Sequence, residues 1–305
     1  MLRVTRILAP NPSVYTLEGT NTWIVGEGPT VVIDPGPLDD GHLAEVAEVA
    51  AQRGGVGAVL VTHDHPDHAP GAAPFAERVG APLYAFRLQG AEHLRDGQRI
   101  RGGTTGDGAA LDLVALHTPG HTSDHVAFHV ASSAALFTGD AVLGRGTSFI
   151  DPPDGDLRQY LRSLDRMLDL APATIYPGHG PVVVRAQAKL REYLEHRAQR
   201  EAQVLAALDG GGVTVPEMVA VIYADYPPEV HEMAGRSVLA HLLKLESEGR
   251  AQRDGGGDTV TWSVSTPRSC ERCGKPVKGR ARYCSTCSLV MLQEGGETSK
   301  DAEGS

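Results

Sequence analysis

Over its first 183 residues the chain alternates short apolar runs with longer stretches whose apolar residues recur at helical spacing. The run "GGVGAVLV" at 54–61 is typical of a strand buried in a parallel sheet. The stretch "HLAEVAEVAAQRGG" at 42–55 predicts an amphipathic helix that ends at its glycines, and "DLRQYLRSLDRMLDL" at 156–170 predicts another. Strands that alternate with helices predict an α/β domain, which we place at residues 1–183.

The pattern changes after residue 183. An apolar stripe predicts a long connecting helix over residues 184–208, and the glycines that follow it mark a boundary. Residues 209–265 predict two helices and a hairpin. The first helix begins near Pro216, "EVHEMAGRSVLAHLLKLESEGR" supplies the second, and "AQRDGGGDTVTWSV" supplies two short strands around glycines. This order of elements resembles a winged helix.

All four cysteines lie near the end of the chain, in residues 266–290. They are Cys270, Cys273, Cys284 and Cys287, two Cys-x-x-Cys pairs on either side of a ten-residue spacer. This spacing predicts a zinc-ribbon-like module that holds one structural zinc through four thiolates. Two disulfides are the weaker alternative, because the chain shows no export signal. Residues 291–305 are polar, and we expect them to be disordered.

Composition and hydropathy bound the class of protein. A chain of 305 residues with 41% hydrophobic residues fits two or three globular units. Its longest apolar runs fall short of the ~20 residues that span a bilayer. The N-terminus offers an apolar stretch too short for a signal peptide. We therefore expect a cytoplasmic protein without a membrane partner.

The segment "VTHDHPDHAPG" at 61–71 concentrates ionisable side chains directly after the predicted strand at 54–61. Such side chains resist burial unless a metal ion binds them, so the segment predicts a metal site. The alternative interpretation is a polar loop exposed to solvent. Alternate residues of an extended chain point the same way, so His63 and His65 can bind one ion. We expect Asp67 and His68 to lie at the start of a helix and to bind another. Imidazole and carboxylate ligands suit zinc, and also iron or manganese.

Three more candidate ligands follow strands and glycine-containing turns elsewhere in the chain. They are His121 in "TPGHTS", Asp140 in "ALFTGDAVLG" and His179 in "ATIYPGHGP". The total is seven candidate ligands. A catalytic zinc uses three protein ligands and a water, so seven ligands predict two ions that share one carboxylate.

The motifs "HDHPDH", "PGHT", "TGDAVLG" and "PGHGP" resemble, in this order, the metallo-β-lactamase fold superfamily across residues 1–183. The resemblance implies an αββα sandwich with a dinuclear site at the sheet edges. It assigns His63, His65 and His121 to one ion, it assigns Asp67, His68 and His179 to the other, and it makes Asp140 the bridge. His65 stands where the flavodiiron branch has glutamate, which favours hydrolysis over oxygen reduction. The carboxylate of Asp140 favours glyoxalase-II-like or ribonuclease-like chemistry over lactam hydrolysis.

Further segments narrow the resemblance to one branch of the superfamily. "GTNTWIVG" at 19–26, "GDAVLGRGTSF" at 139–149 and the winged helix that follows are similar to the β-lactamase-like-protein-2 branch. The cysteine module departs from the usual architecture of that branch, so the resemblance implies nothing about its role. In the resulting expectation, a hydroxide shared by two ions attacks the substrate, and Asp67 orients it as the catalytic carboxylate.

The distribution of charge bears on the substrate. The net charge is −10, and residues 1–183 carry −9, with 12 basic against 21 acidic side chains. Residues 266–290 carry +5, with 6 basic against 1 acidic. An acidic domain disfavours a polyanion, so we expect a small ester or thioester as substrate. Single-stranded RNA recruited by the basic module is the alternative, and a nucleic-acid-binding regulator is a further one. Arg145 is a weaker candidate for binding an anionic substrate.

Overall fold

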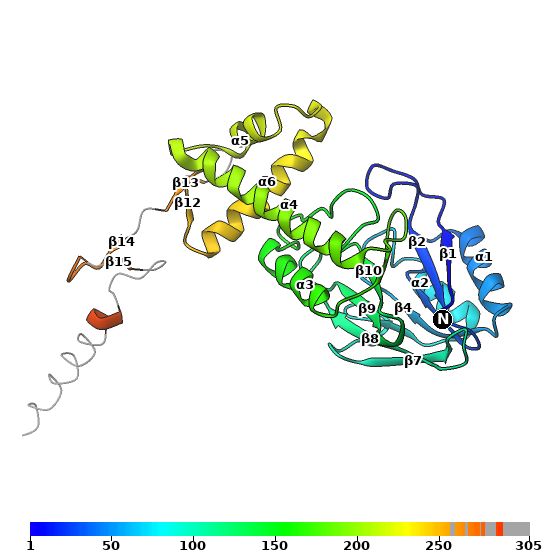
Figure 1. The fold of residues 1–305 in the computed structure, drawn as a ribbon. Helices are drawn as coiled ribbons and strands as arrows, with labels where there is room; N and C mark the ends of the chain where they lie inside the picture. The colour runs from blue at the N-terminus through cyan, green and yellow to red at the C-terminus, as the bar shows by residue number, and fades with distance from the viewer. Residues whose placement is uncertain (257–259, 266–267, 275, 278–284, 289–305) are drawn as a thin grey trace, which may run out of the picture. The chain divides into compact units, whose positions relative to one another are not determined.

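The computed structural model describes residues 1–256, 260–265, 268–274, 276–277 and 285–288 (Figure 1). The chain divides into two compact units, Met1–Arg200 and Glu201–Ser305, and the division falls within helix α4 (Ala186–Ala207). No helix among the described residues is both long enough and apolar enough to cross a membrane.

The first unit contains a six-stranded sheet in the order β1-β2-β3-β4-β5-β6. Its strands are β1 (Val4–Leu8), β2 (Asn21–Val25), β3 (Thr30–Ile33), β4 (Val56–Leu60), β5 (Leu83–Ala85) and β6 (Glu92–His93). The first three strands pair antiparallel, whereas β3 to β6 pair parallel. Helices α1 (Asp40–Ala51) and α2 (Ala72–Val79) cover one face of this sheet with Leu43, Val46 and Phe75. The strand predicted at 54–61 and the helix predicted at 42–55 are confirmed.

A second, five-stranded sheet of this unit has the order β11-β10-β9-β8-β7. Its strands are β7 (Arg99–Thr104), β8 (Ala110–His117), β9 (Val126–Val130), β10 (Ala135–Gly139) and β11 (Thr174–Pro177). The 3-10 turn η1 (Ala131–Ser133) connects β9 to β10, and helix α3 (Leu157–Asp169) follows β10. The helix predicted at 156–170 is thereby confirmed.

The main core of the first unit lies between the two sheets. Trp23 from β2 and Val31 from β3 belong to the same buried cluster as Phe128 from β9 and Phe137 from β10. The rings of Trp23 and Phe137 meet edge to face at 6.3 Å between centroids. Two sheets that share a core, with helices outside them, form the predicted αββα sandwich (Figure 1). Burial of these aromatic rings supplies much of the driving force for holding the sheets together.

The second unit contains the predicted order of two helices and a hairpin. Its elements are η2 (Leu208–Gly210), α5 (Val215–Ile222), η3 (Pro228–Val230), α6 (His231–Ser247), β12 (Ala251–Asp254) and β13 (Thr261–Val264). Thr214 and Glu217 form a reciprocal capping box at the start of α5. Trp262 of the hairpin is buried in a cluster with Val238 and Leu242 of α6, which fixes the hairpin on the helices. The winged helix is therefore confirmed as a unit with a core of its own.

Short strands β14 (Arg268–Ser269) and β15 (Pro276–Val277) pair antiparallel in the cysteine segment. Three of the four cysteines fall in the described part of the chain. Cys284 and the segment 291–305, for which we predicted disorder, lie outside the described residues.

One local expectation was wrong. Asp67 and His68 lie in a turn, in which the amides of His68 and Ala69 both donate to the His65 carbonyl, and α2 begins only at Ala72. Pro70 contributes to this, because a proline biases the residue before it away from helical backbone.

Candidate metal centre

The ends of several strands meet at one edge of the sandwich and bring the seven candidate ligands together. His63 follows β4, His121 follows β8, Asp140 follows β10 and His179 follows β11. Two glycines make this approach possible. A Cβ at Gly120 would lie 2.3 Å from the Tyr160 backbone, with φ at +136°. A Cβ at Gly178 would lie 2.4 Å from Asp140 Oδ1. Only glycine fits at either position.

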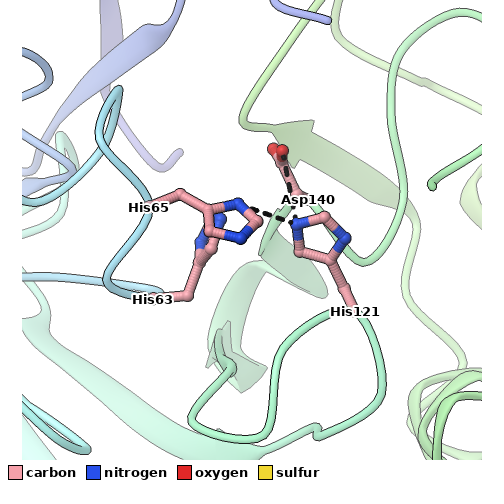
Figure 2. Close-up of side chains that lie close together, drawn as sticks. All are labelled: His63, His65, His121 and Asp140. Atoms are coloured by element: carbon pink, nitrogen blue, oxygen red, sulfur yellow. Dashed lines mark hydrogen bonds and ion pairs between the residues drawn. The ribbon is translucent and has the colours of Figure 1, made fainter. Parts of the chain in front are cut away.

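The first group of ligands consists of His63, His65, His121 and Asp140. Their ligand atoms all lie within 4.8 Å of one another, and His121 Nε2 lies 3.2 Å from His65 Nδ1. Figure 2 shows the three imidazoles pointing toward one another, with the Asp140 carboxylate beside them. Three nitrogens and one oxygen thus converge on one point.

The second group consists of Asp67, His68 and His179. Asp67 Oδ2 lies 3.2 Å from Nε2 of His68 and 3.2 Å from Nε2 of His179. The two imidazole nitrogens are 3.3 Å apart. This group therefore also has the donor set of a metal site, with one carboxylate and two imidazoles.

Asp140 lies between the two groups. Its Oδ2 is 3.3 Å from His179 Nε2 and 3.8 Å from His121 Nε2, and its Oδ1 is 3.4 Å from His68 Nε2. One carboxylate thus faces imidazoles of both groups, as a bridging ligand would.

The spacing and the unsatisfied atoms fit metal ions. Two nitrogens that each bind a tetrahedral zinc at 2.0–2.1 Å lie about 3.3 Å apart, which is close to the contacts in both groups. Among the described residues, the buried His63 Nε2 has no hydrogen-bond partner. A buried polar atom without a partner is costly, and metal coordination would satisfy it.

The outer nitrogens of the histidines fix which ring atom faces the centre. Nδ1 of His121 donates to the Phe149 carbonyl at 2.7 Å, and Nδ1 of His179 donates to the Gly19 carbonyl at 3.2 Å. A carbonyl oxygen can only accept, so the hydrogen of each neutral ring lies on Nδ1. The lone pair of Nε2 then faces the centre in both rings, which is the form that binds a metal.

Asp34 organises the site, and our sequence analysis missed it. Its Oδ2 accepts from His68 Nδ1 at 2.9 Å and from Thr62 Oγ1 at 2.8 Å, while Oδ1 accepts from the Thr62 amide at 2.7 Å. The same hydroxyl lies 2.9 Å from His63 Nδ1, so one buried carboxylate orients a histidine of each group. Asp34 has φ at +50°, a backbone conformation that costs energy in a non-glycine residue. The sequence feature that could have identified Asp34 is its position at the end of the strand in "VVIDPG". This segment contains no histidine and so does not resemble the ligand motifs.

The electrostatics of the two groups differ. Burial disfavours charge on His179, but the Asp140 carboxylate raises the pKa of His179 to about 9. Burial acts in the same sense on His68, whose pKa is nonetheless raised well above its usual range by Asp67 and Asp140. In the first group, burial lowers the pKa of His121 to about 4. The second group therefore attracts positive charge, whereas His121 of the first group keeps its lone pair free of a proton at neutral pH.

Three further histidines of the first unit, His117, His125 and His129, lie outside both groups. His117 stacks on Phe86, and His125 Nδ1 is 2.9 Å from Thr118 Oγ1. His129 also belongs to neither group.

A separate group of sulfurs lies in the cysteine segment. The Sγ atoms of Cys270, Cys273 and Cys287 lie within 4.8 Å of one another. The predicted fourth ligand, Cys284, falls outside the described residues.

Comparison with known proteins gives two family matches. Residues 15–179 match the metallo-beta-lactamase superfamily, and residues 214–262 match the beta-lactamase associated winged helix domain. The chain is 34% identical to a beta-lactamase-like protein 2 homolog of Caenorhabditis elegans, over 81% of this chain and 85% of that protein. It is also 34% identical to an atrochrysone carboxyl ACP thioesterase of Aspergillus chevalieri, over 86% of this chain and 87% of that protein.

A solved structure has the same fold. A beta-lactamase domain protein from Burkholderia ambifaria superposes with a TM-score of 0.73 at 21% identity, and the match covers 86% of this chain and 91% of that one.

The first testable prediction concerns Asp34. We expect Asp34→Asn to weaken zinc binding by ~10- to 100-fold, because the amide no longer holds His68 and Thr62 through a full negative charge. Zinc competition against a chelator measures the effect. Asp39→Asn is the matched control, since Asp39 caps α1 through its side-chain oxygen and asparagine can do the same. Equal zinc affinity in the two variants would contradict the role of Asp34.

Proposed function

Because the chain belongs to the hydrolases of the metallo-beta-lactamase superfamily, we propose that it binds two metal ions at the candidate centre and cleaves a small thioester or ester. The observation that carries this proposal is the position of Asp140 between two groups of ligands. The seven ligands are His63, His65, Asp67, His68, His121, Asp140 and His179. Zinc is our preferred metal, with iron or manganese as alternatives.

Bound at this centre, two divalent ions supply a Lewis acid for the substrate carbonyl and a water whose proton is lost near pH ~7. The chain supplies orientation. The carboxylate of Asp67 is held by Thr20 Oγ1 at 2.9 Å, and its side chain is 23% exposed, more than that of Asp140 at 13%. We assign Asp67 the role of orienting the attacking water, of accepting the proton of the attacking oxygen, and of passing that proton to the departing sulfur or oxygen so that the thiol or alcohol leaves.

A small acyl substrate fits the charge of the predicted catalytic domain, residues 1–183. The −9 of residues 1–183 repels a polyanion and leaves an uncharged carbonyl unaffected. The similarity to a protein named as an ACP thioesterase supports the same choice. A single-strand endoribonuclease is the second candidate, and the observation that favours it is the charge of +5 in residues 266–290.

For the cysteine segment we propose one structural zinc. Three thiol groups within mutual reach support it, and the sequence supplies Cys284 as the fourth ligand. A segment so poor in apolar residues would gain most of its folding free energy from the metal.

An assay on acyl thioesters and on single-stranded RNA tests the proposed function. We expect thioester turnover and no RNA cleavage, at low and at moderate salt, because the net negative charge of residues 1–183 disfavours the many phosphates of a long RNA. Efficient RNA cleavage without thioester turnover would reverse the order of the two candidates.

Replacing the bridging carboxylate tests the dinuclear arrangement. We expect Asp140→Ala to lower kcat by more than ~100-fold. Loss of a residue that only hydrogen-bonds to a metal ligand lowers activity by up to ~100-fold, and loss of a ligand should cost more. The apolar core is untouched, so circular dichroism and solubility should match those of the exposed control Asp40→Ala. Turnover close to that of the native enzyme would exclude the bridging role.

Metal content provides a further prediction. We expect three ions per fully loaded chain, two at the main centre and one in the cysteine segment, as measured by elemental analysis. The double variant Cys270→Ser, Cys273→Ser should contain two and keep its hydrolase activity. A native chain that holds about one metal would refute this stoichiometry.

A further inference from the structure

Three loops meet at His179, at the second ligand group. Its ring donates to the Gly19 carbonyl, which belongs to the loop before β2. Its carbonyl accepts from the Gly144 amide at 2.9 Å, which belongs to the loop after β10. The backbone of Thr20 also pairs with that of His179. Whatever extends from Gly19 and Gly144 therefore lies beside the candidate centre.

The residues next to these two glycines are Glu18 and Arg145, and they form an ion pair. Their side chains are 53% and 60% exposed, so the pair lies at the surface. Gly180 leaves room for the Arg145 backbone, since a Cβ there would lie 3.3 Å from the Arg145 amide nitrogen. Arg145 thus directly follows Gly144, whose amide contacts the backbone of the candidate metal ligand His179.

We propose that Arg145 binds an oxyanion of the substrate, either a phosphate on the thiol carrier or a carboxylate on the acyl group. The proposal rests on the proposed thioesterase function. A guanidinium presents two parallel N–H donors that match a carboxylate or phosphate, and one terminal nitrogen of Arg145 donates to Glu18 Oε1. Exposed ion pairs contribute little to stability, so an incoming anion displaces Glu18 at small cost.

A purely structural role is the competing explanation. In that case the ion pair only ties the loop before β2 to the loop after β10, and removing either partner should have the same effect. If Arg145 binds substrate, the two removals act in opposite directions. Loss of Arg145 removes the binding group, whereas loss of the Glu18 charge removes its competitor. The sign of the two effects therefore separates the explanations.

Binding of coenzyme A and of pantetheine to the metal-loaded protein tests the proposal without turnover. The two ligands share the thiol arm, and coenzyme A adds the phosphates together with an adenosine. We expect Arg145→Ala to weaken coenzyme A binding about tenfold and Glu18→Gln to strengthen it severalfold, while pantetheine binding is unchanged, by isothermal titration calorimetry. The matched control is the exposed pair Arg78–Asp40 at 3.1 Å, whose variants Arg78→Ala and Asp40→Asn should change neither.

Steady-state kinetics identify which anion is bound. The substrates are acetyl-coenzyme A, S-acetylpantetheine and S-succinylpantetheine. We expect Arg145→Ala to raise KM about tenfold with kcat unchanged, because the lost interaction binds the substrate and the transition state equally. The rise should occur only with acetyl-coenzyme A if the anion is a phosphate, in agreement with the binding experiment. It should occur only with the succinyl substrate if the anion is a carboxylate, and an uncleavable thioether analogue of S-succinylpantetheine should then replace coenzyme A as the binding probe.

The outcomes that overturn the proposal are distinct from failure of the proposed function. Equal losses on all three substrates, or effects of the same sign for Arg145→Ala and Glu18→Gln, would show that the pair only ties the loops together. Tighter binding of a single-stranded oligoribonucleotide than of coenzyme A, lost in Arg145→Ala, would assign the residue to nucleic acid and overturn the proposal. Failure of the native enzyme to cleave any thioester would refute the proposed function, and the binding signs would still decide whether Arg145 binds a small anion.

Discussion

The first unit depends on the desolvation of carboxylates and imidazoles that are buried together. Asp140 and His179 are almost fully removed from water, and so is Asp34 behind them. Burial alone would neutralise such groups, so each carboxylate must face a positive partner and each imidazole must keep its outer nitrogen satisfied. The contacts of His121 with Phe149 and of His68 with Asp34 provide this, and they leave the inner atoms facing one another. The ends of the strands bring these carboxylates and imidazoles within contact distance of one another.

Much of the fold could be predicted from the sequence because it depends on local signals. The apolar run at 54–61 and the leucine spacing at 156–170 each specify an element without help from distant residues, and both elements are present. The candidate ligands were visible because each follows a strand and a glycine turn. The site residues that escaped notice depend on distant partners. Asp34 acts on His68, 34 residues away, and Glu18 meets Arg145, 127 residues away, with no repeated spacing to mark either pair. The start of α2 was predicted too early because Asp67 and His68 closely follow the end of β4, and a turn separates them from the helix.

The winged helix has its own basis of stability. Trp262, Val238 and Leu242 are buried within the second unit, and a capping box starts α5. Its net charge is negative, with 4 basic against 9 acidic side chains in residues 209–265. That composition disfavours the phosphate contacts on which DNA-reading winged helices depend. The family match to a beta-lactamase associated winged helix domain agrees with a unit that accompanies the catalytic domain.

The spread of the ligands along the chain has a consequence for biosynthesis. His121 meets His65 across 56 residues, whereas His179 meets His68 across 111. During translation the three histidines of the first group leave the ribosome well before His179 does. Contacts that span long stretches of chain form late, so the second group is completed only when β11 has joined its sheet. The ligands of the two proposed ion sites are thus completed in the order in which the chain is synthesised, the first group before the second.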